Sequence, residues 1–306
     1  MTALPEHAPG KSLWSRLFPY LLIAPTLVFV FAFTLLPAVN TVIDSLYKIP
    51  RNARDAPEFV GLQNYADLFN PDHFIGSNFV LIVGNTLVFS FVTVIVGVPL
   101  ALLFALLLNR RLRGMAIWRF SLFYPALLPL IGAASIWAFL FSDTVGLINT
   151  VLRGFGGRGV NWLGDPNVVL WAVILINIWK QTGYFMIFYL AGLQNISRDF
   201  YEAAELDGAN EWQKLVSLTL PLLRRTTLFV LVIAFTFAFQ TVEQLQVLGQ
   251  GDPGGRSNLL LYYIFDTIQE RRNWGYVNAM TVILVLILLV FTITNFVVFE
   301  RSRDED

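Results

Sequence analysis

Hydrophobic residues along this chain gather in six long runs that shorter polar segments separate. Each run approaches the ~20 apolar residues that an α-helix needs to cross a bilayer. The runs cover roughly Phe18–Ile43, Phe79–Leu108, Ile117–Phe141, Val168–Leu193, Thr226–Leu248 and Tyr276–Phe299. They predict an all-α membrane protein with six transmembrane helices, a transmembrane domain over residues 18–299, and polar tails over 1–17 and 300–306.

Prolines interrupt three of these runs, at Pro25, Pro37, Pro99, Pro125 and Pro129. A bilayer tolerates proline in a helix where neighbouring groups satisfy the freed backbone carbonyls. The prolines therefore predict a packed bundle of kinked helices, not a set of isolated anchors.

Composition supports a membrane protein, since 56% of residues are hydrophobic, 14% are charged, and the mean hydropathy is +0.62. A formal net charge of zero gives no long-range attraction to nucleic acid. The absence of cysteine excludes disulfides and thiolate metal sites. His7 and His73 lie far apart and outside the runs, which argues against a histidine metal site. Met1–Lys11 is expected to be a disordered tail and not a signal peptide, because the first apolar run is too long.

Lysine and arginine predict the orientation in the membrane, because they accumulate in cytoplasmic loops. With six spans, both termini lie on one side, and twelve basic residues share that side against eight on the other. The twelve are Lys11, Arg16, Arg110, Arg111, Arg113, Arg119, Arg198, Lys214, Arg224, Arg225, Arg301 and Arg303. Both termini and the loop before the fifth run are therefore expected in the cytoplasm.

That loop, Tyr201–Pro221, is the longest polar and well-punctuated segment of the chain. Asp199 is predicted to cap a short helix, and Glu202, three residues later, to complete a capping box. In this helix, Glu202 is expected in the first turn, where a carboxylate suits the positive end of the dipole. Gly208 is predicted to stop the helix in a left-handed conformation.

A second helix is predicted directly after this turn. Asn210 offers its cap, with Gln213 three residues later. Pro221 indicates where the second helix ends or bends. In the first helix, Ala203 and Ala204 make one side small enough for another surface to approach closely. The segment thus predicts helix, tight turn and helix between two spans.

The residues of this loop resemble the cytoplasmic loop of binding-protein-dependent ABC importer permeases, which have the type I permease fold. The family pattern is Glu-Ala-Ala, two variable residues, Asp-Gly-Ala, and a Leu-Pro about ten residues later. Eight positions match: Glu202, Ala203, Ala204, Asp207, Gly208, Ala209, Leu220 and Pro221. The chain departs from the pattern at Leu215, where an aromatic residue is frequent, and at Arg225, where a second proline is frequent. The alternative is an ordinary amphipathic loop.

Further marks resemble the carbohydrate-uptake members of the same family and extend the resemblance over about residues 18–299. They are Gly61–Tyr65, Asn85–Thr86, Gly146–Asn149, Ile178–Lys180, Leu190–Gln194 and Gly275–Tyr276. The loop Gly249–Gly255 departs from the family's run of glycines, because Gln250 and Asp252 interrupt it. That departure leaves specific contacts with a binding protein open.

The resemblance implies a permease subunit that pairs with a second homologous permease, an ABC ATPase dimer and an extracytoplasmic solute-binding protein. The loop would dock on the ATPase, and alternating access would carry a sugar or a sugar-like solute, such as a glycerol phosphodiester, across a bacterial or archaeal inner membrane. By the same resemblance, ATP and Mg²⁺ would be bound by the ATPase. The glycine-rich segments of this chain, Gly154–Gly159 and Gly249–Gly255, lack the Lys-Ser/Thr of a phosphate-binding loop. No cofactor is expected on this chain.

Polar residues inside the predicted spans indicate where the solute passes, because a buried polar group usually faces a cavity or a partner. The candidates are Lys180, Gln181, Tyr184, Gln240, Glu243 and Gln244. Gln240 and Gln244 are four residues apart, which predicts one helix face. A structural salt bridge between Lys180 and Glu243 is the alternative to a role in the path.

Four aromatic residues of the spans also have two interpretations. They could stack on sugar rings, or they could belong to the aromatic belt at the membrane interface. These residues are Trp137, Trp179, Tyr184 and Tyr189.

Two other classes of function remain to be weighed. A membrane-embedded enzyme would need a nucleophile, a metal set or a carboxylate pair within the spans, and the sequence has no such cluster. A channel or secondary transporter that works alone often shows internal repeats, and no clear repeat is evident. An importer permease without catalytic residues of its own is the preferred hypothesis.

Overall fold

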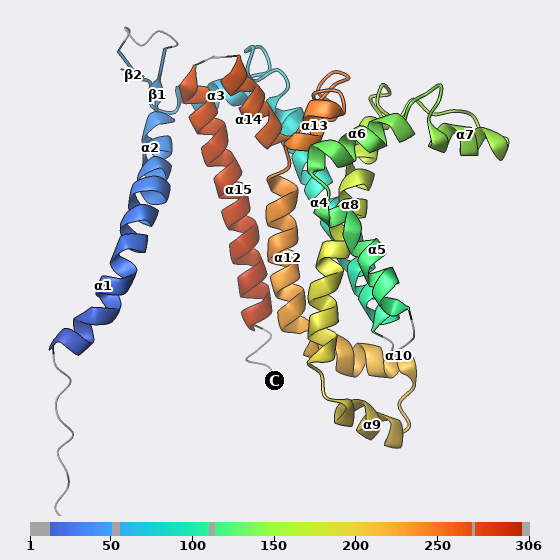
Figure 1. The fold of residues 1–306 in the computed structure, drawn as a ribbon. Helices are drawn as coiled ribbons and strands as arrows, with labels where there is room; N and C mark the ends of the chain where they lie inside the picture. Colours follow the sequence, from blue (N-terminus) through green and yellow to red (C-terminus); the bar gives the residue numbers. More distant parts are fainter. Residues whose placement is uncertain (1–12, 51–55, 110–113, 271–272, 302–306) are drawn as a thin grey trace, which may run out of the picture.

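The computed structural model describes residues 13–50, 56–109, 114–270 and 273–301, and it is largely helical (Figure 1). By length and composition, five of its helices could cross a membrane, or six if one sharply bent pair counts as a single span. The all-α membrane fold predicted from the hydrophobic runs is therefore confirmed. The first helix begins at Leu13, five residues before the predicted start of the first span.

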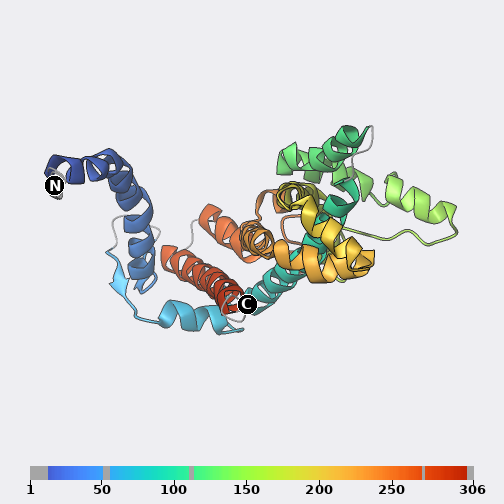
Figure 2. The ribbon, with the colours of Figure 1, turned by 90° about the horizontal axis from the view of Figure 1, so that it is seen from below.

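The first span forms a long arm beside the bundle, composed of α1 (Leu13–Val30), a π-helical segment (Phe31–Leu35) and α2 (Leu36–Asp44). None of its most apolar window is buried inside the chain. The α2 end packs against the bundle, on α15 (Trp274–Arg301). Seen from below, α1 lies along the edge, apart from the other helices (Figure 2). Its apolar surface is therefore left for lipid or for another protein.

The centre of the bundle is the pair α4 (Phe79–Leu108) and α8 (Val169–Gln194), which contact each other along their lengths. Helix α12 (Arg224–Phe239) packs on both, and α15 packs on α12. Small residues bring the central pair close, since a Cβ added to Gly97 would lie 3.8 Å from the Thr182 hydroxyl. Close packing over this length creates the main core cluster of the molecule.

The third predicted span, Ile117–Phe141, is not one straight helix. It is divided into α5 (Met115–Leu127) and α6 (Leu130–Leu140), which meet at an angle of 100°. Leu128 is extended (φ −70°, ψ 138°), as expected for a residue before proline, and Pro129 is the N-cap residue of the second helix. The prolines predict a kink, and in the structure α5 packs on α8 while α6 packs on α13, on the two sides of the bend.

The fifth predicted span, Thr226–Leu248, is also broken. Helix α12 ends at Phe239, Gln240 adopts φ −97° and ψ 16° as its C-cap, and α13 (Glu243–Val247) begins three residues later. The prediction that Gln240 and Gln244 share one helix face is therefore wrong, because no continuous helix joins them.

Short elements gather at the two ends of the bundle (Figure 1). One end carries a two-stranded sheet and small helices, and the opposite end carries the polar loop. The first group is β1 (Tyr47–Lys48), β2 (Glu58–Phe59), α3 (Gln63–Phe69), α7 (Leu147–Gly154), α13 and α14 (Leu260–Gln269). The second group is α9 (Arg198–Leu206), α10 (Glu211–Gln213), a π-helical segment (Lys214–Thr219) and α11 (Leu220–Leu222).

The strands and α3 are held on the bundle by buried polar contacts. Asn64, which is 2% exposed, donates from Nδ2 to the carbonyls of Ser45 at 2.8 Å and Tyr47 at 2.9 Å. The Tyr276 hydroxyl at the start of α15 donates to Asp67 Oδ2 at 2.8 Å. These bonds explain why an Asn-Tyr pair and a Gly-Tyr pair mark the two segments in the sequence.

Candidate functional site

The polar loop between the fourth and fifth spans projects from one end of the bundle, below α8 and α12 (Figure 1). Its first helix, α9, is capped by Ser197, whose side-chain oxygen accepts from the backbone N–H of Asp199 at 3.3 Å. The predicted cap at Asp199 is thus wrong by two residues. Glu202 consequently lies in the second turn and not in the first, so it is too far along to complete a capping box.

Gly208 ends α9 in the predicted left-handed conformation, with φ +78°. The N–H of Ala209 donates to the carbonyl of Ala204 at 2.9 Å, and the N–H of Gly208 donates to Glu205 at 3.0 Å. This pair of bonds is a Schellman motif, which satisfies carbonyls at the end of a helix. Asp207 occupies the C-cap. The Asp-Gly-Ala sequence is therefore the turn itself, and it sets the direction in which the chain leaves α9.

The second cap is confirmed in full. Asn210 Oδ1 accepts from the Gln213 N–H at 2.9 Å, and Gln213 Oε1 accepts from the Asn210 N–H at 2.8 Å. The helix then continues as a π-helical segment up to Thr219. Pro221 follows as one of the first residues of α11, and a turn at Leu223 separates α11 from α12. The proline thus lies where the loop bends into the fifth span.

Lys214 fastens the two halves of the loop to each other. Its ammonium donates to Glu205 Oε1 at 2.9 Å and pairs with Glu211 on the other side, while its side chain is only 9% exposed. The hydrogen bond to Glu205, followed by that to Glu211, raises the pKa of Lys214 above its usual value of 10.5, so the ammonium stays charged at neutral pH. A second link joins the Tyr201 hydroxyl and Thr219 Oγ1 at 3.0 Å. The angle between α9 and the following helix is therefore held by side chains.

Large apolar side chains stand out on this loop. Leu206 is 90% exposed, Trp212 is 71% exposed and Phe200 is 54% exposed. Such residues on a polar, water-facing loop indicate a surface that another protein covers. These residues are not among the predicted coupling residues, although three bulky apolar residues in an otherwise polar segment were the available signal.

The eight predicted coupling residues fall into two groups, one at the Schellman turn after α9 and one in α11. Glu202, Ala203, Asp207 and Gly208 are exposed, whereas Ala204 and Ala209 are half-buried. Leu220 and Pro221 are exposed in α11, where the loop joins the fifth span. The first six form one compact unit around the Schellman turn, and the last two lie apart from it. Their coupling role stays a prediction.

Among the predicted solute-path residues, Lys180 has a clear structural role. Its Nζ donates to the carbonyls of Leu128 at 2.8 Å, Ala126 at 3.1 Å and Pro125 at 3.4 Å. These carbonyls end α5 at the bend, where the helix stops and, in the part of the chain that the structure describes, only that of Pro125 accepts a backbone bond, from the Leu128 N–H at 3.2 Å. Within the described residues, no ion pair of 4.0 Å or less joins Lys180 to Glu243. The alternative of a direct salt bridge is therefore not what the structure shows.

The other path candidates differ in burial. Gln181 and Tyr184 are half-buried on α8, whereas Gln240 and Glu243 are exposed at the break after α12. Gln244 is fully buried, and neither atom of its amide has a hydrogen-bond partner among the described residues.

Asn177 is the polar contact that the sequence analysis missed. Its Nδ2 donates to the Thr241 hydroxyl at 3.3 Å and so connects α8 to the break between α12 and α13. Both residues are at most 5% exposed. An asparagine within an apolar run was the available signal, because polar side chains between membrane helices commonly bond across them.

The four aromatic candidates pack within the protein to different extents. Tyr189 is 1% exposed and belongs to the main core cluster. Trp137 meets Trp179 edge to face, with 5.5 Å between the ring centroids. Tyr184 packs against Phe188 and Phe237. Burial argues against a lipid-belt position for Tyr189.

The bundle of long apolar helices, with the capped helices of the polar loop at one end and short helices at the other, defines a multi-span membrane protein. The described residues contain no group of three His, Asp or Glu residues that could hold a metal ion. Residues 83–303 match the family described as "Binding-protein-dependent transport system inner membrane component". The chain belongs to that family, and it is therefore the permease component of an ABC importer. The resemblance inferred from its loop residues is confirmed.

Relatives match nearly the whole chain. The chain is 34% identical to the trehalose/maltose transport system permease protein MalF of Thermococcus litoralis, over 93% of this chain and 94% of the relative. It is 33% identical to the arabinooligosaccharides permease AraP of Bacillus subtilis, over 94% and 92%. It is 30% identical to the sn-glycerol-3-phosphate permease UgpA of Agrobacterium fabrum, over 94% and 96%.

A solved structure has the same fold. A chain of the bacterial alginate ABC transporter, crystallised with an alginate pentasaccharide-bound periplasmic protein, superposes with a TM-score of 0.80. The match covers 95% of this chain and 98% of that chain at 23% identity. At this identity the likeness supports the fold alone, and that fold is the permease bundle.

Proposed function

We propose that this permease carries a saccharide or a saccharide-like solute, which a solute-binding protein delivers, into the cell. The names of the relatives support the solute class, since they concern trehalose and maltose, arabinooligosaccharides and glycerol 3-phosphate. The chain supplies the path, and the energy comes from ATP that a separate ATPase dimer binds with Mg²⁺. A second, homologous permease completes the path, and α1, whose most apolar window has no burial within the chain, is available to it.

The observation that carries the proposal is the loop formed by α9 to α11. It projects from one end of the bundle, its turn is held by a Schellman motif, and Leu206 and Trp212 are exposed on it. A rigid projection with an apolar surface can transmit a push or a pull from a soluble partner to α8 and α12. ATP-driven closure of the ATPases would thus move the two spans that this loop connects.

The same proposal sets the orientation. The loop faces the cytoplasm, where ATP is available, and both termini lie on that side. Residues 143–166, at the opposite end, then face the binding protein. Reporter fusions test this arrangement: a periplasm-active reporter at Asp306 would contradict it, and an active reporter after Asp143 is expected.

Reconstitution tests the function as a whole. The permease pair, the ATPase and the binding protein are incorporated into liposomes, and uptake of labelled maltose, an arabinooligosaccharide and glycerol 3-phosphate is measured. We expect ATP-dependent uptake of one class, and loss of that uptake in Glu202→Lys, which reverses a charge on the exposed surface of α9. Uptake by the permease without ATPase would favour a transporter that works alone, whereas unchanged coupled uptake in Glu202→Lys would contradict docking through α9.

A further inference from the structure

The end of the bundle that carries the polar loop, called here the inner end, contains a basic cavity of ≈ 630 Å³. The cavity lies between the ends of α4 and α8 and the starts of α5 and α9. Its polar lining comes from Arg119, Arg198, Asn109, Gln194 and Tyr201. Among the described residues that line it, none is acidic. The cavity therefore combines two guanidinium groups with neutral hydrogen-bonding side chains, which is the chemistry of an anion site.

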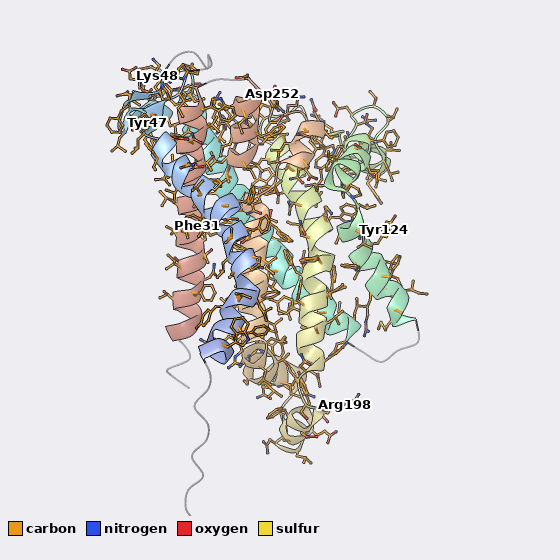
Figure 3. The ribbon with its side chains drawn as sticks, turned by 60° about the vertical axis from the view of Figure 1, so that its left-hand side comes forward. Phe31, Tyr47, Lys48, Tyr124, Arg198 and Asp252 are labelled. Atoms are coloured by element: carbon orange, nitrogen blue, oxygen red, sulfur yellow. The ribbon has the colours of Figure 1, made fainter. Side chains whose placement is uncertain are left out.

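The cavity lies at the depth where the membrane surface is expected, because two spans end there. The candidate spans Phe79–Leu108 and Val169–Gln194 both end at it, and Arg198 lies four residues beyond the second span. Figure 3 places Arg198 at the lower end of the bundle, where α9 begins. Lipid headgroups occupy this depth, at the boundary between hydrocarbon and water.

The Arg119 guanidinium is fixed in position and still has donors to offer. Its Nε and Nη2 donate to the carbonyl of Leu108 at 3.2 Å and 2.7 Å, at the end of α4. These bonds use two of the five N–H groups of an arginine. The remaining donors are held beside the cavity on a side chain that is already ordered, which lowers the entropy lost on binding.

An apolar groove adjoins the basic cavity and shares Arg119 and Gln194 with it. The groove has a volume of ≈ 330 Å³. It starts at the shared residues and runs between α5 and α8. Its other lining residues are Phe120, Phe123, Ile187, Leu190 and Ala191. Phe120 is 58% exposed and Ile187 is 39% exposed, so the groove opens outward.

We infer that this composite site binds an anionic phospholipid, with its phosphate headgroup at Arg119 and Arg198 and an acyl chain in the groove between α5 and α8. A basic cavity at the interface that leads into an apolar groove matches both parts of such a lipid, and basic pockets between membrane helices bind anionic headgroups. The site belongs to the inner leaflet if the orientation proposed above holds. Because α9 starts at the cavity, the lipid would also brace the base of the polar loop.

The test is a direct measurement of lipid binding to the complete, purified and delipidated transporter. Phosphatidylglycerol and phosphatidylcholine are titrated separately, and bound lipid is counted by native mass spectrometry. We expect phosphatidylglycerol to bind more tightly, and Arg198→Gln to weaken it roughly fivefold, as one interfacial arginine should. Arg225→Gln is the matched control, because Arg225 is an exposed arginine at the same end that does not line the cavity. Equal affinities in wild type and both variants would overturn the inference.

A second variant separates a lipid from other occupants. Ala191→Trp fills the apolar groove and leaves both arginines in place, so it should weaken binding of phosphatidylglycerol as well. If Ala191→Trp has no effect and soluble glycerol phosphate competes fully, the site holds a free anion and the lipid assignment is wrong. If Ala191→Trp instead removes the second permease from the purified complex, the groove is a subunit interface and the assignment is also wrong. Lipid counting does not depend on uptake, so a failure of the proposed solute class would leave this result interpretable.

Discussion

Gly208 offers the sharpest test of how the polar loop works, because its conformation alone decides the outcome. Its φ is +78°, and a Cβ added there would have no heavy atom within 4 Å. A substitution therefore causes no steric clash, and the whole cost is the left-handed backbone, about 1–2 kcal/mol for an L-residue. A penalty of this size lowers the population of the turn by about 5- to 30-fold relative to competing conformations.

We expect Gly208→Val to insert in the membrane normally and to lose ATPase docking or solute-stimulated ATP hydrolysis. Gly208→Asn should retain most of both, because asparagine tolerates the left-handed region better than other residues. Co-purification of the ATPase with the tagged permease measures docking, and phosphate release in proteoliposomes measures coupling.

Gly61 supplies a matched control for the docking measurement. It has φ +58° and equally open space, but it lies near α3 at the opposite end of the bundle. Gly61→Val should therefore leave ATPase co-purification unchanged. Near-normal docking and stimulated hydrolysis in Gly208→Val would refute the reasoning, since the loop would then be a simple linker. Equal loss of docking in Gly61→Val and Gly208→Val would show a general folding defect.

Three further predictions test the contacts described above. Lys214→Met removes both ion pairs of the loop and should weaken ATPase co-purification while the bundle keeps its thermal stability; an unchanged affinity would mean that the turn holds α9 unaided. Lys180→Met leaves the carbonyls at the end of α5 without their charged donor, and it should lower stability by roughly 1.5–3 kcal/mol with little change in apparent solute affinity, as thermal unfolding and uptake kinetics would show. Gly183→Leu places a Cβ 1.8 Å from the carbonyl oxygen of Leu122 and should prevent stable accumulation, whereas Gly97→Ala, whose Cβ finds only an ordinary contact at 3.8 Å, should accumulate normally in membranes.

Local chemistry made several features predictable from the sequence. Apolar length identifies the membrane spans, because only a helix of about 20 residues satisfies its backbone across a bilayer. The left-handed turn at Gly208 and the capping box of Asn210 and Gln213 follow from residues that are neighbours in the chain. Those features depend on residues within one or two turns of backbone. Tertiary packing therefore does not decide whether they form.

Contacts between distant segments decided the rest. Pro129 predicts a break, but the 100° angle between α5 and α6 depends on the approach of α5 to Gly183, where the absence of a side chain admits the Leu122 carbonyl. The role of Lys180 depends on the same bend, since it brings the carbonyls of three residues at the end of α5 to the ammonium. The break at Gln240 separates it from Gln244, which their spacing alone would place together. Apolar spans look alike in sequence, and only their packing determines where a helix turns and which polar groups meet.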